Sequence, residues 1–100
     1  MTPKYNIGDC VARCYGNEIL WIGKITKIYT CNGDDELTYY FREFFPYEHE
    51  RYCFNEFAWP QSFVEEECVP FPSEVFAKME KAYYTMVKQI DEILDAEIGK

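Results

Sequence analysis

The chain has 100 residues, of which 48% are hydrophobic and 19% are aromatic, so it can build one core and one domain. The formal net charge of −8 argues against a general nucleic-acid-binding protein, because contacts with phosphates need a basic surface. No apolar segment reaches membrane-spanning length and the first residues lack a signal-peptide pattern, so we expect a cytoplasmic protein with no membrane partner.

The first two predicted strands form a hairpin. An apolar segment over residues 9–15 ends in a turn at 15–18, where Gly16 and Asn17 are typical turn residues. A longer β-rich segment follows over residues 19–31. Its length suits a strand that bends and serves both halves of a curled sheet.

The apolar positions of this second strand do not alternate cleanly. Trp21 and Ile25 share one face, but Ile28 lies three positions beyond Ile25 and would fall on the other face. A bend or bulge near Gly23 or at residues 26–27 would return Ile28 to the core side. The spacing therefore predicts a bulged strand.

The third predicted strand, residues 37–44, alternates well, and the Asn-Gly pair at 32–33 is a strong hairpin signal before it. One face carries Leu37, Tyr39 and Phe41, and the other carries Thr38, Tyr40, Arg42 and Phe44. Because the second set includes the charged Arg42, we expect Tyr40 and Phe44 on the outer, ligand-facing side.

Residues 45–60 alternate only weakly, and we expect a fourth strand near 51–57. Residues 62–70 predict one tight helical turn that leads into a short closing strand. Pro70 and Pro72 are expected to end the sheet, because proline cannot donate a ladder hydrogen bond.

From Ser73 the hydrophobic period changes from two to about three and a half residues, which predicts an amphipathic helix that ends near Gly99. Its apolar stripe comprises Phe76, Met79, Tyr83, Met86, Val87, Ile90, Ile93 and Leu94. Such a helix spans roughly 38 Å, whereas a barrel of about 65 residues is about 25–28 Å across. We expect its first turns to pack on the barrel and its last turns to pair with another chain.

Four short motifs follow one another in the order of a small β-barrel. They are GDCVA at 8–12, WIGKITKI at 21–28, YYF at 39–41 and ECVP at 67–70. Over residues 5–72 this series resembles the strands of SH3-like barrels, and among these it is most similar to Tudor-like domains. The resemblance implies a mainly β fold with a five-stranded antiparallel barrel over residues 1–72. The helix over residues 73–100 is an addition packed on the barrel within a single domain.

Tudor-like domains of the reader kind bind methylated lysine or arginine in a cage of aromatic rings. The resemblance implies Tyr15, Trp21, Tyr40 and Phe44 as cage candidates, with Glu43 as their acidic partner. The position of Trp21 on its strand favours the core instead, and the other rings fit core packing or a plain protein interface equally well.

The sequence carries no metal-binding or catalytic pattern. The five cysteines are scattered along the chain, and we expect them to be small buried hydrophobic residues. Cys10 and Cys14 would lie about 13 Å apart on a strand, which is too far for both to bind one zinc ion. The single His49 stands between two glutamates, and no nucleophile motif or glycine-rich phosphate loop is present. We expect a protein that is not an enzyme and binds no cofactor.

Three functions stay open. The leading one is an interaction module that binds a protein partner, basic partners included, through exposed aromatic residues and the helix, with a homodimer through the helix as one form of it. The second is an acidic regulator whose carboxylates at 34–36 and 65–67 imitate nucleic-acid phosphates and block a basic groove. The third is a reader of nucleic acid or methylated residues, for which the available basic residues are Arg13, Lys24, Lys27 and Arg42.

The residues expected to bind fall into two groups. The candidate binding residues of the barrel are Tyr15, Tyr40, Glu43, Phe44, Tyr47 and Trp59. The candidate interface of the helix comprises Tyr83, Met86, Ile90, Ile93 and Leu94.

Overall fold

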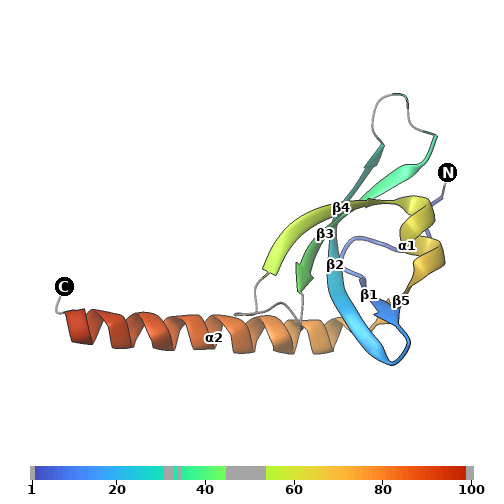
Figure 1. Cartoon of the computed structure of the whole chain (residues 1–100). Helices are drawn as coiled ribbons and strands as arrows, with labels where there is room; N and C mark the ends of the chain where they lie inside the picture. Colours follow the sequence, from blue (N-terminus) through green and yellow to red (C-terminus); the bar gives the residue numbers. More distant parts are fainter. Residues whose placement is uncertain (1, 31–32, 34, 45–53, 99–100) are drawn as a thin grey trace.

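The computed structural model describes residues 2–30, 33, 35–44 and 54–98 (Figure 1). The elements in chain order are β1 (Cys10–Tyr15), β2 (Glu18–Thr30), β3 (Leu37–Phe44), β4 (Phe54–Pro60), α1 (Gln61–Glu67), β5 (Cys68–Phe71) and α2 (Ser73–Ile98). The strands form one antiparallel sheet in the order β4-β3-β2-β1-β5. The prediction of a mainly β fold with five antiparallel strands and one long C-terminal helix is confirmed. We call β1 to β5 together with α1 the sheet domain.

The bulge predicted in the second strand lies at Thr26. The register of β2 against β3 shifts between Ile25 and Lys27, so one extra residue stands in β2 at this point. The extra residue brings Ile28 to the same side as Ile25, which is fully buried, and Ile28 packs against the same core. The irregular isoleucine spacing is thus the sequence signature of a bent strand.

Gly23 has a different role from the bend expected there. A Cβ atom at this position would lie 2.8 Å from Cδ1 of Phe41 and 3.1 Å from Cζ3 of Trp21. These two rings meet edge to face, with centroids 5.7 Å apart. Glycine therefore lets two large aromatic rings lie against the backbone of β2.

The sheet is buried on both faces over part of its area. The inner, concave side holds the main core, formed by Tyr5, Val11, Trp21, Ile25, Tyr39, Phe41, Val64 and Cys68. A second cluster on the outer side contains Cys10, Ala12, Ile22 and Phe76, with Phe44 and Met79 packed against it. Trp21 is a core residue, as its strand position predicts.

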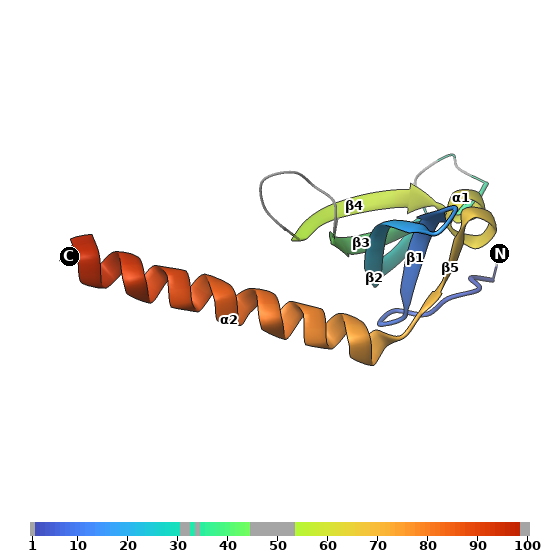
Figure 2. The ribbon, with the colours of Figure 1, turned by 60° about the horizontal axis from the view of Figure 1, so that its bottom comes forward.

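The second cluster is where α2 joins the sheet domain. Phe76 has no exposed surface and Met79 lies beside it, so the first two turns of α2 cover the outer side of β1 and β2. Every residue from 88 to 98 is exposed. Figures 1 and 2 show α2 running beyond the strands, and the molecule measures 55 × 33 × 24 Å. The predicted overhang of the helix is confirmed.

Two strand predictions need correction. The fourth strand, Phe54–Pro60, continues three residues beyond the expected end at 57, since it pairs with β3 as far as Pro60; residues 51–53 of the expected strand lie outside the described residues. Pro70 lies inside β5, opposite Val11, instead of ending the sheet. Proline is tolerated there because β5 is an edge strand and pairs with β1 alone.

The helices of the described segments include none with the length and apolar character needed to cross a membrane.

Candidate functional site

Among the described residues, a group of exposed apolar side chains lies on the free part of α2. It consists of Met86, Ile90, Ile93, Leu94 and Ile98, and we call it the apolar stripe. Ile93 is 62% exposed and Ile98 is 76% exposed, although isoleucine is among the residues most often buried. Spacings of three and four residues place these side chains on one side of the helix. A continuous apolar surface of this kind is typical of a site that binds another macromolecule.

The direction of α2 is held by polar contacts just before the stripe begins. Nε of Arg42 on β3 lies 3.0 Å from Oε2 of Glu80. The same guanidinium donates a hydrogen bond to the hydroxyl of Tyr84 and lies 5.5 Å from the centroid of its ring. Arg42 therefore ties the middle of α2 to the sheet, and the stripe projects from a fixed base.

A small apolar groove marks the point where the helix leaves the sheet domain. It has a volume of about 230 Å³ and is lined by Phe44, Met79, Ala82, Tyr83 and Met86. Phe44 and Tyr83 are half-buried. The groove adjoins the apolar stripe through Met86, so the two form one apolar surface.

A second groove lies on the outer face of β2 and β3. It has a volume of about 530 Å³ and is lined by Thr26, Lys27, Tyr29, Tyr40 and Glu56. The ammonium of Lys27 lies 5.8 Å from the centroid of the Tyr40 ring, and the hydroxyl of Thr26 donates to the carbonyl of Tyr40 over 3.2 Å. Tyr40 thus stands on the outer face, in a wide groove that presents both charges and two phenol rings.

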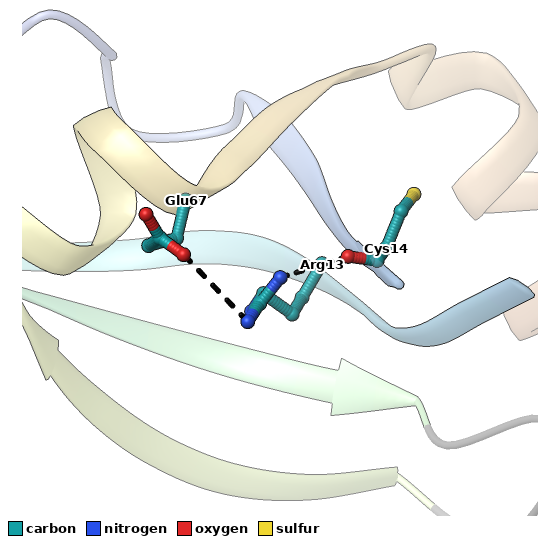
Figure 3. Close-up of polar contacts among 3 residues, drawn as sticks. All are labelled: Arg13, Cys14 and Glu67. Carbon is teal, nitrogen blue, oxygen red and sulfur yellow. Dashed lines mark hydrogen bonds and ion pairs between the residues drawn. The ribbon is translucent and has the colours of Figure 1, made fainter. Parts of the chain in front are cut away.

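The inner side contains a stack of aromatic rings. The rings of Trp21 and Trp59 are parallel to within 6°, with centroids 5.8 Å apart, and Phe63 stacks on Trp59 at 4.7 Å. The guanidinium of Arg13 covers the stack 5.6 Å from the Phe63 centroid. Arg13 is itself held 3.7 Å from Glu67 and donates to the Cys14 carbonyl over 2.8 Å (Figure 3).

Glu43 contacts the Trp59 ring of this stack, and its side chain has no exposed surface. Oε2 accepts a hydrogen bond from Nε1 of Trp59, whereas Oε1 has no hydrogen-bond partner. Burial raises the pKa of Glu43 to about 7, against the lowering effect of the Trp59 bond. The carboxyl therefore exchanges a proton near neutral pH, but it does so inside the core.

Three carboxylates from the two acidic segments, those of Glu36, Glu65 and Glu67, form contacts within the fold. Oε2 of Glu65 accepts hydrogen bonds from the Tyr39 hydroxyl over 2.6 Å and from the Lys4 backbone N–H over 2.9 Å. Glu67 pairs with Arg13. Glu36 accepts a hydrogen bond from the backbone N–H of Ser62 over 2.7 Å. These carboxylates fasten the N-terminal segment and α1 to the sheet, so they do not form one row of free charges.

The residues named as cage candidates are not brought together. Tyr15 lies at the tip of the β1–β2 hairpin, Trp21 is in the core, and Tyr40 and Phe44 are on the outer face. Glu43 faces inward and is not available beside them, which corrects its expected position. The alternation of Tyr39 and Phe41 on the inner face, continued by two residues, would have placed Glu43 inside.

The other predicted residues divide between the sheet and the helix. Trp59 is half-buried in the aromatic stack, and Tyr47 lies outside the described residues. Tyr83 lines the apolar groove, while Met86, Ile90, Ile93 and Leu94 are exposed on α2. The contact between Arg42 and Tyr84, which ties the middle of α2 to the sheet, was not predicted because it joins residues 42 positions apart.

Within the described segments no group of three or more His, Cys, Asp or Glu residues is placed to hold a metal ion. No protein-family model, no curated protein and no solved structure matches this chain.

Proposed function

We propose that this protein is a non-enzymatic interaction module that binds a protein partner, with the apolar stripe of α2 as its main contact surface. The observation that carries the proposal is the exposure of Met86, Ile90, Ile93, Leu94 and Ile98 on a helix fixed to a small, well-packed sheet domain. The exposed aromatic groove around Tyr40 is a second contact surface. Lys27 and Glu56, which both line this groove, suit a polar peptide at the rim of an interface.

The resemblance of residues 5–72 to SH3-like barrels supports the same role, since small barrels of this kind serve as recognition modules. We propose a cytoplasmic location, with which the free thiols of Cys10, Cys14 and Cys68 are compatible.

The acidic-regulator hypothesis receives less support. It needs a row of free carboxylates, and Glu65 and Glu67 instead bind Tyr39 and Arg13. The affinity of partner binding through the apolar stripe is expected to change little with salt concentration. Binding through carboxylates that imitate phosphates would instead weaken steeply as the salt concentration rises.

The proposal is tested by photo-crosslinking in the native cell. The photoreactive amino acid p-benzoylphenylalanine replaces Ile93 in the stripe or, as a control, Thr85, which is exposed and lies outside it. We expect a protein adduct of defined mass from position 93 and none from position 85. A second substitution, Leu94→Asp, should remove the adduct. Failure to form a protein adduct at positions 86, 90 and 93 alike would refute the proposal.

A further inference from the structure

We propose that the partner of the apolar stripe is a basic amphipathic helix of another protein, whose apolar face packs on the stripe and whose lysine or arginine side chains face the carboxylates of Asp91, Asp95 and Glu97. This inference rests on the proposed function, because it names the kind of partner that the same surface accepts. The spacing of the stripe decides that the partner is a helix, and the acidic residues around the stripe decide its charge.

The apolar stripe has the dimensions of a surface that accepts one helix. Its members follow one another at short helical steps from Met86 to Ile98, over about 18 Å of the helix axis. Side chains spaced in this way form a ridge that packs into the groove of a second helix. Within the described part of the chain every residue from 88 to 98 is exposed, and Figure 2 shows this part of α2 running beyond the strands. A helix of about three turns can therefore lie along it.

Glu97 places a carboxylate inside the apolar stripe. It follows Ile93 by four residues and Leu94 by three, so it lies on the same side of α2. Around the helix axis it is only about 20° from Ile90. A carboxylate covered by a purely apolar surface loses its hydration without compensation, which is strongly unfavourable. The helix that covers the stripe therefore has to offer a cation to Glu97.

Asp91 and Asp95 add two carboxylates at one border of the stripe. Asp91 lies about 20° around the helix axis from Ile98, and Asp95 follows Asp91 about one turn later. The opposite side of the same segment is balanced, because Lys88 and Glu92 stand there four residues apart. The stripe side of this segment thus combines apolar side chains with three negative charges and no positive charge.

The acidic residues also stand at the end of α2 where the helix itself disfavours them. The C-terminal end of a helix carries a partial negative charge, so carboxylates destabilise that end and cations stabilise it. The last turn of α2 contains no basic residue, whereas Asp95 and Glu97 both belong to it. Exposed apolar side chains and an acidic C-terminal turn are two departures from a stable free helix, and they lie on one surface. A basic amphipathic helix relieves both of them.

The same charges disfavour other occupants of an exposed apolar helix. A second copy of this chain brings the same excess of carboxylates to the contact. Anionic membrane surfaces and nucleic acids are negatively charged as well. The apolar side chains supply most of the affinity, and complementary charges determine which partner is accepted. Among these occupants, the basic helix is the one whose charge complements the stripe.

The charge of the partner is tested with two fluorescein-labelled peptides and the purified full chain. Both peptides match the stripe in length and carry leucine at alternating steps of three and four residues. One has lysine beside the leucines and the other has glutamate at the same positions. In fluorescence anisotropy we expect the lysine peptide to bind about 10-fold or more tightly than the glutamate peptide. Ile90→Ser removes an apolar contact and should weaken binding of the lysine peptide about 10-fold.

The role of the carboxylates is tested by reversing their charge. The double variant Asp91→Lys/Glu97→Lys should prefer the glutamate peptide. The control Glu66→Lys/Glu92→Lys changes the net charge equally at exposed positions away from the stripe and should still prefer the lysine peptide. Thermal unfolding followed by tryptophan fluorescence should remain cooperative in both variants. The inference is overturned if the natural chain does not prefer the lysine peptide, or if both double variants change the preference equally.

The two proposals fail in different ways. The adduct formed in cells from position 93 is digested, and the crosslinked segment is sequenced by mass spectrometry. A segment with apolar residues at helical spacing and an excess of lysine and arginine supports the inference. A segment without that excess, or one from a second copy of this chain, overturns the inference and leaves the proposed function standing. The absence of a protein adduct at positions 86, 90 and 93 overturns both.

Discussion

The substitution Glu43→Gln tests the burial of the Glu43 carboxyl in the core, because glutamine does not ionise but retains an oxygen that accepts a hydrogen bond from Trp59. In the folded protein the pKa of this carboxyl is about 7, raised by burial from its ordinary value of 4.5. Between these two values the folded chain keeps the proton and the unfolded chain releases it. The free energy of unfolding therefore falls as the pH rises through this range.

The size of the effect follows from the two pKa values. Each unit of pKa difference between the folded and unfolded chain corresponds to about 1.4 kcal/mol. Ionisation of Glu43 therefore lowers the free energy of unfolding by about 3 kcal/mol at pH 8. The full contribution is present below pH 4.5 and is lost above pH 7. The glutamine variant lacks this loss, and its stability relative to the natural chain should rise by about 3 kcal/mol between pH 4 and pH 8.

The measurement is urea unfolding at pH 4, 5, 6, 7 and 8, followed by the fluorescence of Trp21 and Trp59. The difference between the variant and the natural chain cancels the titration of all other groups. Glu66→Gln, at an exposed position of α1, serves as the matched control and should give a constant difference. A difference for Glu43→Gln that stays within about 0.5 kcal/mol over the whole range would refute our account of a buried, half-satisfied carboxyl.

Two further substitutions test the packing on the two sides of the sheet. Gly23→Ala places a methyl group 2.8 Å from Cδ1 of Phe41, so the ring of Phe41 must move from its place against Trp21. We expect the free energy of unfolding, measured with urea, to fall by about 1–3 kcal/mol. An unchanged free energy of unfolding would show that the rings are not held there. Phe76→Ala empties the outer cluster and should cost about 3–5 kcal/mol. Amide hydrogen exchange in residues 73–82 should accelerate in this variant, and unchanged protection would contradict anchoring of α2 by Phe76.

Much of the fold follows from local patterns in the sequence. The period of two in β3, the bulge implied by Ile25 and Ile28, and the period of α2 each depend on neighbouring residues alone. The overhang also follows, because it needs only the length of the helix and the approximate size of a domain built from the remaining residues.

Other features depend on contacts between distant segments, and the sequence does not encode them locally. The position of β4 is set by its register against β3, where Phe44 pairs with Phe54 and Thr38 with Pro60. The contact of Arg42 with Tyr84 joins a strand to a helix. Glu43 was expected beside Tyr40 and Phe44 as the acidic partner of an aromatic cage, yet the strand alternation places it in the core, where its raised pKa reflects the unfavourable burial of its charge.

The edge strand β5 bears on how far copies of this protein can associate. It has four residues, one of them is Pro70, and the chain enters α2 at Ser73 directly after Pro72. A short edge that lacks one backbone donor is a poor template for the strand of another molecule. The sheet is thus blocked from growing on this side into the open-ended stacks that lead to fibres. Pro70 within β5 and Pro72 directly after it therefore protect this edge of the sheet against pairing with a further strand.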